Sequence, residues 1–431
     1  MITRVPTMVA IRNEQQISVP EYMNEQFFVD TLEEGLRETK VKLYEINYEW
    51  GSNPGDNYCS AIYRVQLSFA RWINGKESSQ KEQTSIIVKT IPIAKETQFL
   101  EDVSVFIKEK QTYTDVLPRL EILTEGDKFG AKYFHAIKTP VQTIVFGDLK
   151  LQGFRTASRE AGLDWEHASM ILQQLGKFHA TSMVLAKKEP SIVQQYHSGM
   201  LSEATLLQSD GFSNMFKGFL KGLIQATARW PGYAHISQHL QRYMDNFQSV
   251  CMAAAQRKSN DRYIVLNHGD MWTNNFMYAY ENKAQPETPT RAIFVDFQLC
   301  FYGSPGCDLN FFLNTSVKLE LLQTRRAELI KVYYKAFSEA LAYARYESIP
   351  SYEDLLWELR SREIYGLFAL FGFLPVVTMP KELSDDSSIE SLNDEAFMQK
   401  KLDAVYSQKF LNDYHKWALK RADELGVFSD Y

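Results

Sequence analysis

The sequence predicts an α+β fold in two parts, a small antiparallel sheet followed by a larger, mainly helical part. Three observations predict it. The chain has 431 residues, which suits two domains or one domain with two lobes. Segments rich in β-branched and aromatic residues occupy the first third, and long helical patterns dominate beyond about Lys150. We therefore predict an N-terminal lobe over residues 1–148 and a C-terminal lobe over residues 149–431.

The N-terminal lobe is predicted to combine an antiparallel sheet with one main helix. A first, amphipathic helix is expected over residues 21–39. The strand-like segments that follow are separated by turn signals in GSNPGDN and NGKESS. They cover residues 42–50, 60–72 and 85–93. Residues 95–117 form the main helix, because their apolar residues recur on one face, and residues 138–149 return to a strand.

The C-terminal lobe is predicted to be mostly helical. The helical segments cover residues 165–186, 201–228, 235–256, 317–346, 352–374 and 395–425. One strand pair is expected between them, at residues 276–280 and 291–297, with a polar loop over residues 281–290. This hairpin therefore stands out in an otherwise helical lobe, and it carries unusual polar residues.

Composition restricts the function. The net charge of −6 leaves no basic surplus to neutralise nucleic-acid phosphates or to bind an anionic membrane. The four cysteines lack C-x-x-C spacing and the density of a secreted disulfide scaffold, which favours reduced thiols and a cytoplasmic location. The apolar run over residues 364–379 is shorter than the ~20 residues of a membrane span, and it indicates a buried helix. No signal peptide and no obligatory protein partner are evident.

The residues VLNHGDMWTNNFMYAY place a His-Gly-Asp turn between two apolar stretches. Asp270 and Asn275 flank the turn before the first strand of the hairpin, and Asp296 ends the second strand. A hairpin brings these ends together. Carboxylate and amide oxygens at one end of a sheet are the hard ligands that Mg²⁺ takes together with substrate phosphates. An aspartate in such a turn can accept a proton from a hydroxyl, although a lone His-Gly-Asp turn can also be a simple connection.

A charged residue interrupts an apolar strand face further upstream. Ile87, Lys89 and Ile91 share one face of a strand, so the Lys89 amine lies in line with apolar neighbours and needs a partner. The alternative is a lysine at a cleft rim that extends to water. Glu109, on the helix that follows, is the candidate ion partner; alternatively, it is a solvated residue of a charged helix.

Two further segments allow two interpretations each. Residues 51–60 join two strands and contain Gly55, Asn57 and Ser60, so this turn either arches over phosphates or is a plain hairpin turn. It matches neither G-x-G-x-x-G nor the P-loop consensus. The aromatic residues of 211–235 either line an acceptor pocket or take part in ordinary helix packing.

The order of these pieces resembles the protein-kinase-like fold in its small-molecule branch, which includes choline kinases and aminoglycoside phosphotransferases. The motifs are more specific. They look like those of the ecdysteroid kinase-like family of insects, also called CHK kinase-like, over roughly residues 20–425. The motifs are GDNYCS, FIKEKQTY with VLP, LGKFHATS, NHGDMWTNNFM and VDFQLCFYGSPGCDLNFFL.

The resemblance implies a bilobal enzyme that uses ATP and Mg²⁺ to phosphorylate a hydroxyl of a small molecule, an ecdysteroid or another lipophilic or foreign alcohol. By matching position, Lys89 holds the α- and β-phosphates and pairs with Glu109. Asp270 is the implied catalytic aspartate, and Asn275 and Asp296 are the implied metal ligands.

The resemblance also implies a nucleotide-binding set. It comprises Gly55, Asn57, Ser60, Lys89, Phe146 and Asp148. Residues 144–149 would be the hinge whose backbone hydrogen-bonds adenine, and Gly147 stands where relatives often carry Glu. His268 is expected to brace the catalytic turn. Asp308 is expected either to cap a helix or to anchor the catalytic loop.

Two other functions stay open. One is a small-molecule-binding protein that kept the fold and lost catalysis, and the other is a choline or amino-sugar kinase. Protein phosphorylation is disfavoured, because the chain has Asp-Phe-Gln at residues 296–298 where protein kinases have Asp-Phe-Gly, and because an activation segment ending in Ala-Pro-Glu is missing.

Overall fold

The computed structural model describes residues 11–12, 15–37, 40–52, 60–91, 101, 104–124, 126–281, 287–379 and 394–429. The chain divides into two compact units. Unit 1 comprises Met1–Ile93 and Ala131–Phe154, and unit 2 comprises Ala94–Gly130 and Arg155–Tyr431. The lobe limits that the sequence suggests, 1–148 and 149–431, remain a prediction.

Unit 1 is built on an antiparallel sheet. Its main strands are β3 (Val41–Trp50), β4 (Ala61–Ile73), β6 (Glu82–Ile91), β7 (Tyr133–Ile137) and β8 (Gln142–Gly147). The strand order is β3-β4-β6-β8-β7, and the short β5 (Lys76–Glu77) pairs with β4. The two-residue strands β1 (Ile11–Arg12) and β2 (Gln15–Gln16) pair with each other, the 3₁₀ helix η3 (Leu149–Gln152) follows β8, and β9 (Phe154–Arg155) lies at the limit of the unit.

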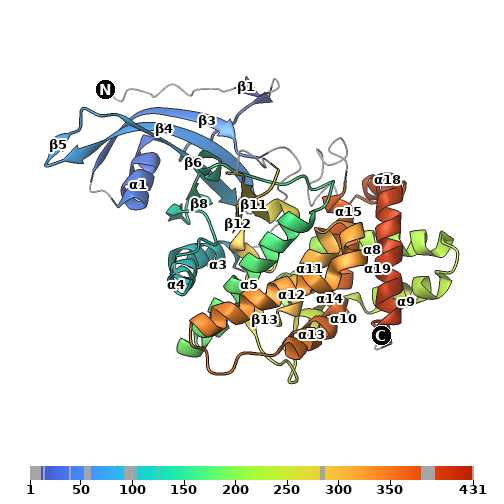
Figure 1. The fold of residues 1–431 in the computed structure, drawn as a ribbon. Helices are drawn as coiled ribbons and strands as arrows, with labels where there is room; N and C mark the ends of the chain where they lie inside the picture. The colour runs from blue at the N-terminus through green and yellow to red at the C-terminus, as the bar shows by residue number, and fades with distance from the viewer. Residues whose placement is uncertain are drawn as a thin grey trace. The chain divides into compact units, whose positions relative to one another are not determined.

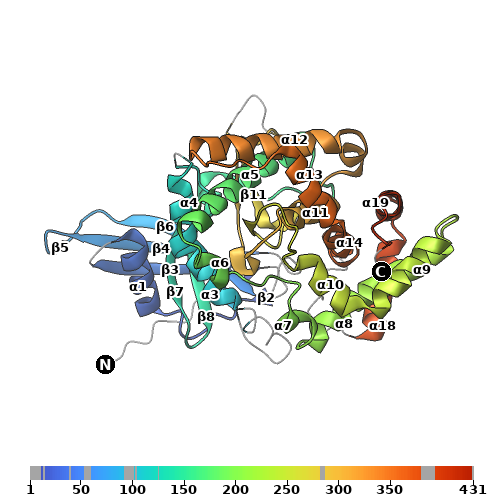
Figure 2. The same cartoon turned by 90° about the horizontal axis from the view of Figure 1, so that it is seen from below.

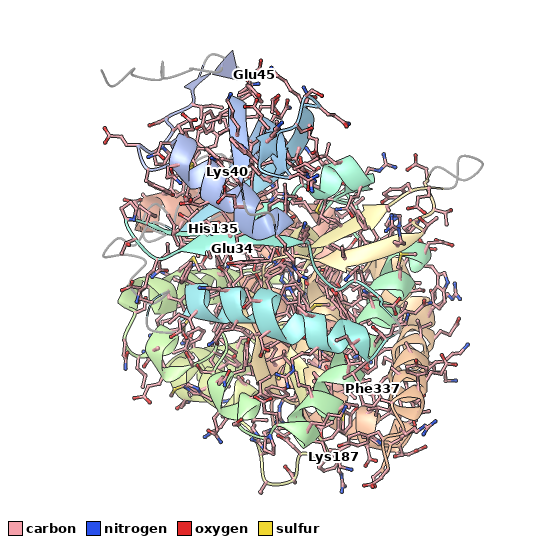
Figure 3. All side chains as sticks on the ribbon, turned by 90° about the vertical axis from the view of Figure 1, so that its left-hand side faces the viewer. Glu34, Lys40, Glu45, His135, Lys187 and Phe337 are labelled. Carbon is pink, nitrogen blue, oxygen red and sulfur yellow. The ribbon has the colours of Figure 1, made fainter. Side chains whose placement is uncertain are left out.

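One helix covers one face of this sheet (Figure 1). Helix α1 (Glu25–Leu36) begins at Asn24, whose side-chain oxygen accepts a hydrogen bond from the amide of Phe27 at 3.2 Å. Its buried Phe28 and Leu32 pack on alternate residues of the sheet, and Glu34 lies 2.5 Å from His135 of β7 (Figure 3). Because side chains alternate along a strand, the residues between these core positions point to the opposite face.

Unit 2 is mainly helical. Its longer helices are α5 (Trp165–Lys188), α8 (Asp210–Arg229), α9 (Ala234–Asp245), α10 (Phe247–Ala255), α11 (Gly306–Thr315), α12 (Leu319–Tyr343), α13 (Tyr352–Ser361), α14 (Glu363–Gly372), α18 (Glu395–Tyr406) and α19 (Lys409–Glu424). The shorter ones are α3 (Val105–Gln111), the π-helical turn η2 (Thr112–Val116), α4 (Leu117–Ile122), α6 (Ile192–Gln195), α7 (Glu203–Leu206), the 3₁₀ turns η4 (Thr273–Asn275) and η5 (Phe297–Leu299), and α15 (Leu374–Val377).

Helices α5 and α12 lie side by side, as both ribbon views show (Figures 1 and 2). Gly176 allows this close approach, because a Cβ at that position would lie 2.6 Å from the carbonyl oxygen of Tyr333. The pair forms a long, rigid support for the elements that carry the unusual polar residues.

Two pairs of short strands interrupt the helices of unit 2. The predicted hairpin is present as β11 (Phe276–Ala279) and β12 (Arg291–Phe294), with Phe276 opposite Phe294. A second pair, β10 (Val265–Asn267) and β13 (Phe301–Gly303), corrects the prediction of a single strand pair. Strands of three residues are too short to show a periodic pattern in the sequence.

Several predicted helices are divided or shifted. The main helix expected over residues 95–117 is described from Val105 and continues through the π-helical turn to Ile122. The helix expected over residues 352–374 consists of α13 and α14, with a break at Arg362. Strand β7 was not predicted. In each case tertiary packing decides the break, and a local hydrophobic pattern does not reveal it.

The predicted α+β fold class is confirmed, with an antiparallel sheet in unit 1 and mostly helices with a hairpin in unit 2. Among the helices in the described part of the chain, none combines the length and the apolar character that crossing a membrane requires.

Candidate active site

Lys89 lies near the end of β6, on the sheet face opposite helix α1. Its side chain is only 4% exposed, so the alternative of a lysine that extends to water is wrong. The residues directly opposite it in the neighbouring strands are Ile62 and Ile144, and Phe146 lies opposite Ile87. Paired residues share a face. The Lys89 amine therefore lies on a sheet face that also carries apolar side chains.

Asp148 follows β8 directly, and its side chain is engaged within unit 1. Its carboxylate accepts hydrogen bonds from Arg64 Nε at 2.7 Å, Ser85 Oγ at 2.8 Å and the Lys150 amide at 3.0 Å. Burial alone would raise the pKa of Asp148, but the hydrogen bonds from Arg64, Ser85 and the Lys150 amide outweigh it and lower that pKa. The carboxylate is thus a structural group after the strand that was predicted as the hinge.

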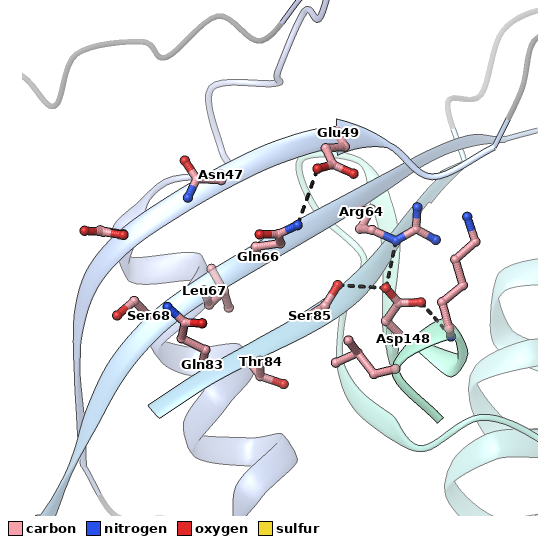
Figure 4. Close-up of a pocket in the computed structure, with 13 residues that line it drawn as sticks. Asn47, Glu49, Arg64, Gln66, Leu67, Ser68, Gln83, Thr84, Ser85 and Asp148 are labelled. Carbon is pink, nitrogen blue, oxygen red and sulfur yellow. Dashed lines mark hydrogen bonds and ion pairs between the residues drawn. The ribbon is translucent and has the colours of Figure 1, made fainter. Parts of the chain in front are cut away.

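Of the remaining predicted nucleotide-binding residues, the structure describes only Ser60. Ser60 is half-buried and precedes β4 directly, whereas Gly55 and Asn57 lie outside the described residues. A polar groove of about 470 Å³ runs along the Lys89 face of the sheet, across β3, β4 and β6, and is lined by Arg64, Ser85 and Asp148 among others (Figure 4). Its lining does not include Lys89.

The His-Gly-Asp turn is in unit 2, between β10 and η4. Asp270 is 8% exposed, and its Oδ2 accepts a hydrogen bond from Asn275 Nδ2 at 2.9 Å. The same nitrogen donates to the Asp270 carbonyl oxygen at 2.9 Å. The side-chain nitrogen Nδ2 of Asn275 therefore donates both of its hydrogen bonds within the loop. This leaves the side-chain oxygen Oδ1 as the atom that can bind a cation.

Asp308 anchors this turn. It accepts hydrogen bonds from the amides of His268, at 2.6 Å, and Gly269, at 2.9 Å, and His179 Nε2 lies 3.2 Å from the same carboxylate. The helix-cap alternative is wrong, because Asp308 lies inside α11, whose N-cap residue is Pro305. The anchor alternative is confirmed.

His179 supports Asp308 from the opposite side. It is fully buried, and its Nδ1 lies 2.8 Å from the hydroxyl of Tyr333. Burial lowers the pKa of His179, although Asp308 acts in the opposite direction. A carboxylate only accepts hydrogen bonds, so a neutral His179 carries its proton on Nε2 and accepts from Tyr333 through Nδ1. His179 is thus a packed core histidine with a hydrogen-bond partner at each ring nitrogen.

The hairpin places Asn275 beside the residue that precedes Asp296. The amide of Val295 donates to the Asn275 carbonyl oxygen at 3.0 Å, and His268 Nε2 lies 3.0 Å from the Val295 carbonyl oxygen. Asp296 is half-buried and has a left-handed backbone, with φ 68° and ψ 61°. His268 thus braces the turn against the strand end that carries Asp296.

Glu109 belongs to α3, which packs against η5 just after Asp296. It is 1% exposed, so the alternative of a solvated glutamate is wrong. Its pairing with Lys89 would join the two units and remains a prediction. Four residues further on, Tyr113 contacts Phe297 edge-on with ring centroids 5.3 Å apart, and Phe297 contacts His268 at 4.9 Å.

The contacts of Tyr113 and Phe297 were not predicted from the sequence. Burial raises the pKa of Tyr113 well above its usual value, and the charges of Glu109 and Asp296 act in the same direction. One feature of the sequence could have revealed the position of Tyr113. It follows Glu109 by four residues, and this spacing places the two side chains on one helical face.

Gly269→Ala should disrupt the His-Gly-Asp turn. Gly269 has φ 83°, and a Cβ there would lie 2.2 Å from the carbonyl oxygen of Leu299. We expect a loss of at least about 2 kcal/mol of stability, measured by urea denaturation. Gly75→Ala is the control, since its φ is 76° but no atom lies within 4 Å of the added carbon. Equal losses in the two variants would contradict the close approach to Leu299.

The comparison with protein families gives a match with the ecdysteroid kinase-like family over residues 54–346. The chain belongs to the ecdysteroid kinase-like family. This member of the family is accordingly a small-molecule kinase, a phosphotransferase with an alcohol group as acceptor. The recognition and the enzyme class predicted from the sequence are confirmed.

Two solved structures of small-molecule kinases are similar at a low level. A microcompartment-associated aminopropanol kinase has a TM-score of 0.31 and 12% identity, with 85% of this chain and 94% of that chain covered. A glucosamine kinase has a TM-score of 0.31 and 12% identity, with 81% and 94% covered. These scores are too low to say more about this kinase. No curated protein matches the chain.

Proposed function

We propose that this kinase transfers the γ-phosphate of ATP, with Mg²⁺, to a hydroxyl of a lipophilic small molecule such as an ecdysteroid or a foreign alcohol. The observation that carries the proposal is the network of buried hydrogen bonds that holds the His-Gly-Asp turn in place. Asp270 is held by Asn275, the turn is anchored by Asp308, and the strand end that carries Asp296 is braced by His268. A plain connecting turn needs none of these buried polar contacts.

Asp270 is the proposed catalytic residue. Its carboxylate would orient the acceptor hydroxyl and accept its proton as the phosphoryl group is transferred. The hydrogen bond from Asn275 to Oδ2 fixes the rotamer of this side chain. Because the turn is tied to α11 through Asp308, the carboxylate is positioned before substrate arrives, which is how positioning lowers a barrier.

The donor set fits a magnesium ion. A carboxylate from Asp296 and the amide oxygen of Asn275 are hard oxygen ligands, and Asn275 keeps that oxygen available because its nitrogen is occupied. These two residues would hold the ion. When bound, Mg²⁺ neutralises phosphate charge that builds up during transfer.

Unit 1 supplies the proposed nucleotide contacts. Lys89 would hold the α- and β-phosphates, with Glu109 as its ion partner. The apolar side chains of Ile62, Ile87 and Phe146 share the Lys89 face and suit stacking of adenine. Leu149 opens η3, so its amide has no acceptor within that helix and can donate to the base. Gly55, Asn57, Ser60 and Asp148 complete the proposed nucleotide-binding set.

Aromatic residues beside the catalytic turn favour a lipophilic acceptor. Trp272 follows Asp270 by two residues, and its ring centroid lies 6.5 Å from that of the half-buried Phe373. Phe373 in turn contacts Phe216, at 5.4 Å, from the aromatic stretch 211–235. Phe216 and Trp272 are both buried, at 2% and 7% exposed, so packing explains them, whereas the half-buried Phe373 is the residue we expect at the acceptor.

A cytoplasmic location belongs to the same proposal, because ATP and Mg²⁺ are available there. It is supported by Cys251, Cys300 and Cys307, which are free, buried thiols in the described part of the chain.

The test combines binding and turnover. The purified chain should gain thermal stability with Mg-ATP, consume ATP in the presence of steroid or phenolic alcohols, and yield a product heavier by one phosphoryl group in mass spectrometry. Stabilisation without turnover on any alcohol would favour a binding protein that lost catalysis. Turnover on choline or amino sugars alone would overturn the lipophilic acceptor.

Asp296→Asn should weaken the metal-dependent part of ATP binding. The substitution keeps one amide oxygen but removes the negative charge and the second carboxylate oxygen, so the Kd for ATP should rise by about tenfold or more with Mg²⁺ present. The Kd measured in EDTA should not change. Isothermal titration calorimetry gives both values, and Asp245→Asn on the exposed surface of α9 is the control. Nearly normal activity of Asp296→Asn would contradict the proposed role.

A further inference from the structure

The function proposed above places Asp148 in the nucleotide-binding set but gives no role to Arg64, the ion partner of Asp148. Arg64 lies on β4, Ser85 on β6, and Asp148 just after β8, so three strands contribute to one cluster (Figure 4). The backbone takes part as well, because the Asp148 amide donates to the Ser85 carbonyl oxygen at 3.2 Å. We call these three residues the β8 clamp.

The β8 clamp is desolvated, unlike an ordinary surface ion pair. The side chains of Arg64 and Asp148 are 12% and 3% exposed. The Asp148 carboxylate accepts hydrogen bonds from three donors of unit 1, namely the Arg64 guanidinium, the Ser85 hydroxyl and the Lys150 amide. Removing one partner from such a pair leaves a buried charge without compensation, so its loss has a larger effect than the loss of an exposed pair.

The position of the β8 clamp links it to the backbone that follows the sheet. Phe146 is the second-last residue of β8, and Asp148 caps η3 through its hydrogen bond from the Lys150 amide. Leu149 lies between Asp148 and Lys150, so the hydrogen bond that joins those two residues also holds the backbone of Leu149. The clamp therefore fixes the chain direction where the proposed adenine contacts lie.

We propose that Arg64 is a positioning residue for the nucleotide. Acting through Asp148, it holds the backbone of residues 146–149 in the conformation that receives adenine. This inference rests on the proposed function, since it assigns to Arg64 the support of a nucleotide contact. Arg64 acts without touching the base, and its removal should affect nucleotide binding more than the transfer step.

The experiment measures steady-state kinetics of Arg64→Gln. We expect KM for ATP to rise about tenfold, with kcat within about threefold of the wild type. Arg64→Lys should restore part of the loss. The control is Arg71→Gln, which removes an arginine of the same strand whose ion pair with Glu82 is roughly one-third exposed on each side. If both variants lose thermal stability and neither changes KM, the role of Arg64 is only structural and the proposal is overturned.

A double-mutant cycle tests the route through Asp148. When Asp148→Asn is already present, adding Arg64→Gln should raise KM by no more than about twofold. A second full tenfold rise would mean that Arg64 acts independently of Asp148, which also overturns the proposal. If Arg64→Gln does not fold, Ser85→Ala removes another donor of the clamp and should raise KM in the same direction by a smaller factor.

Hydrogen exchange separates this inference from the proposed function. In the absence of nucleotide, Arg64→Gln should speed exchange of the Asp148 and Lys150 amides at least about tenfold relative to Arg71→Gln. Unchanged exchange overturns the clamp whatever the enzyme does. If the wild type neither binds Mg-ATP nor turns over, the proposed function fails and the assignment of Arg64 to the nucleotide fails with it, even where exchange shows the clamp.

Discussion

Asp270→Asn is expected to lower kcat by about 10³-fold while changing the Kd for Mg-ATP by less than about threefold. The substitution removes the carboxylate that would orient the acceptor hydroxyl and accept its proton. It keeps the shape of the side chain and an oxygen that can still accept from Asn275 Nδ2. The turn should therefore keep its structure, and the loss should appear in the chemical step.

The measurement is single-turnover kinetics with saturating Mg-ATP and an acceptor found in the product screen, together with calorimetric binding of Mg-ATP. Asp403→Asn is the control, because Asp403 lies on α18 and its hydrogen bond to Gln399 is exposed. A kcat within tenfold of the wild type would remove Asp270 from the proposed catalytic role. A large loss of Mg-ATP binding would instead place Asp270 among the groups that hold the nucleotide.

Residues in strong local patterns could be placed from the sequence. Asp270, Asn275 and Asp296 flank a hairpin, so one hairpin prediction was enough to bring Asn275 and Asp296 to the same end of two paired strands. Burial of Lys89 followed from the alternation of β6, in which every second side chain shares a face. Both signals act over a few residues, and local propensity and tertiary packing agree there.

The contacts that hold these residues could not be predicted in the same way. Arg64 and Asp148 are 84 residues apart, and no local pattern pairs them. No local pattern pairs His179 with Asp308 either, because they are 129 residues apart. A buried ion pair of this kind depends on which strands or helices become neighbours, and that information is absent from local periodicity.

The π-helical turn η2 also could not be predicted from local periodicity. It lies between α3 and α4, and it adds a residue to the turn that carries Tyr113. Such insertions change which side chains face a neighbour, and they are frequent at functional sites. Here the turn presents Tyr113 to Phe297, which contacts His268. The helix that carries Glu109 is thereby packed, through two aromatic rings, against the His-Gly-Asp turn.

Asp308→Ala is expected to reduce both stability and catalysis. The carboxylate is 1% exposed and accepts the amides of His268 and Gly269, so its removal leaves two buried N–H groups without acceptors and deprives His179 of its partner. An unsatisfied buried donor costs about 1–3 kcal/mol, and we expect a loss of at least about 3 kcal/mol in the free energy of unfolding of unit 2. We also expect kcat to fall by about 10²-fold or more, because the turn no longer holds Asp270.

Asp308→Asn separates the two effects. This variant keeps one oxygen, which can accept one of the two amides, while its NH₂ group faces the other donor. It should fold, lose less stability than Asp308→Ala, and still lower kcat by at least about tenfold with KM for ATP changed by less than about threefold. Urea denaturation and steady-state kinetics provide these values. The control is Asp403→Asn on the exposed surface of α18, which makes the same chemical change away from the turn. A destabilised Asp308→Asn protein with wild-type kcat would show that the anchor serves folding alone and that the geometry of Asp270 does not depend on it.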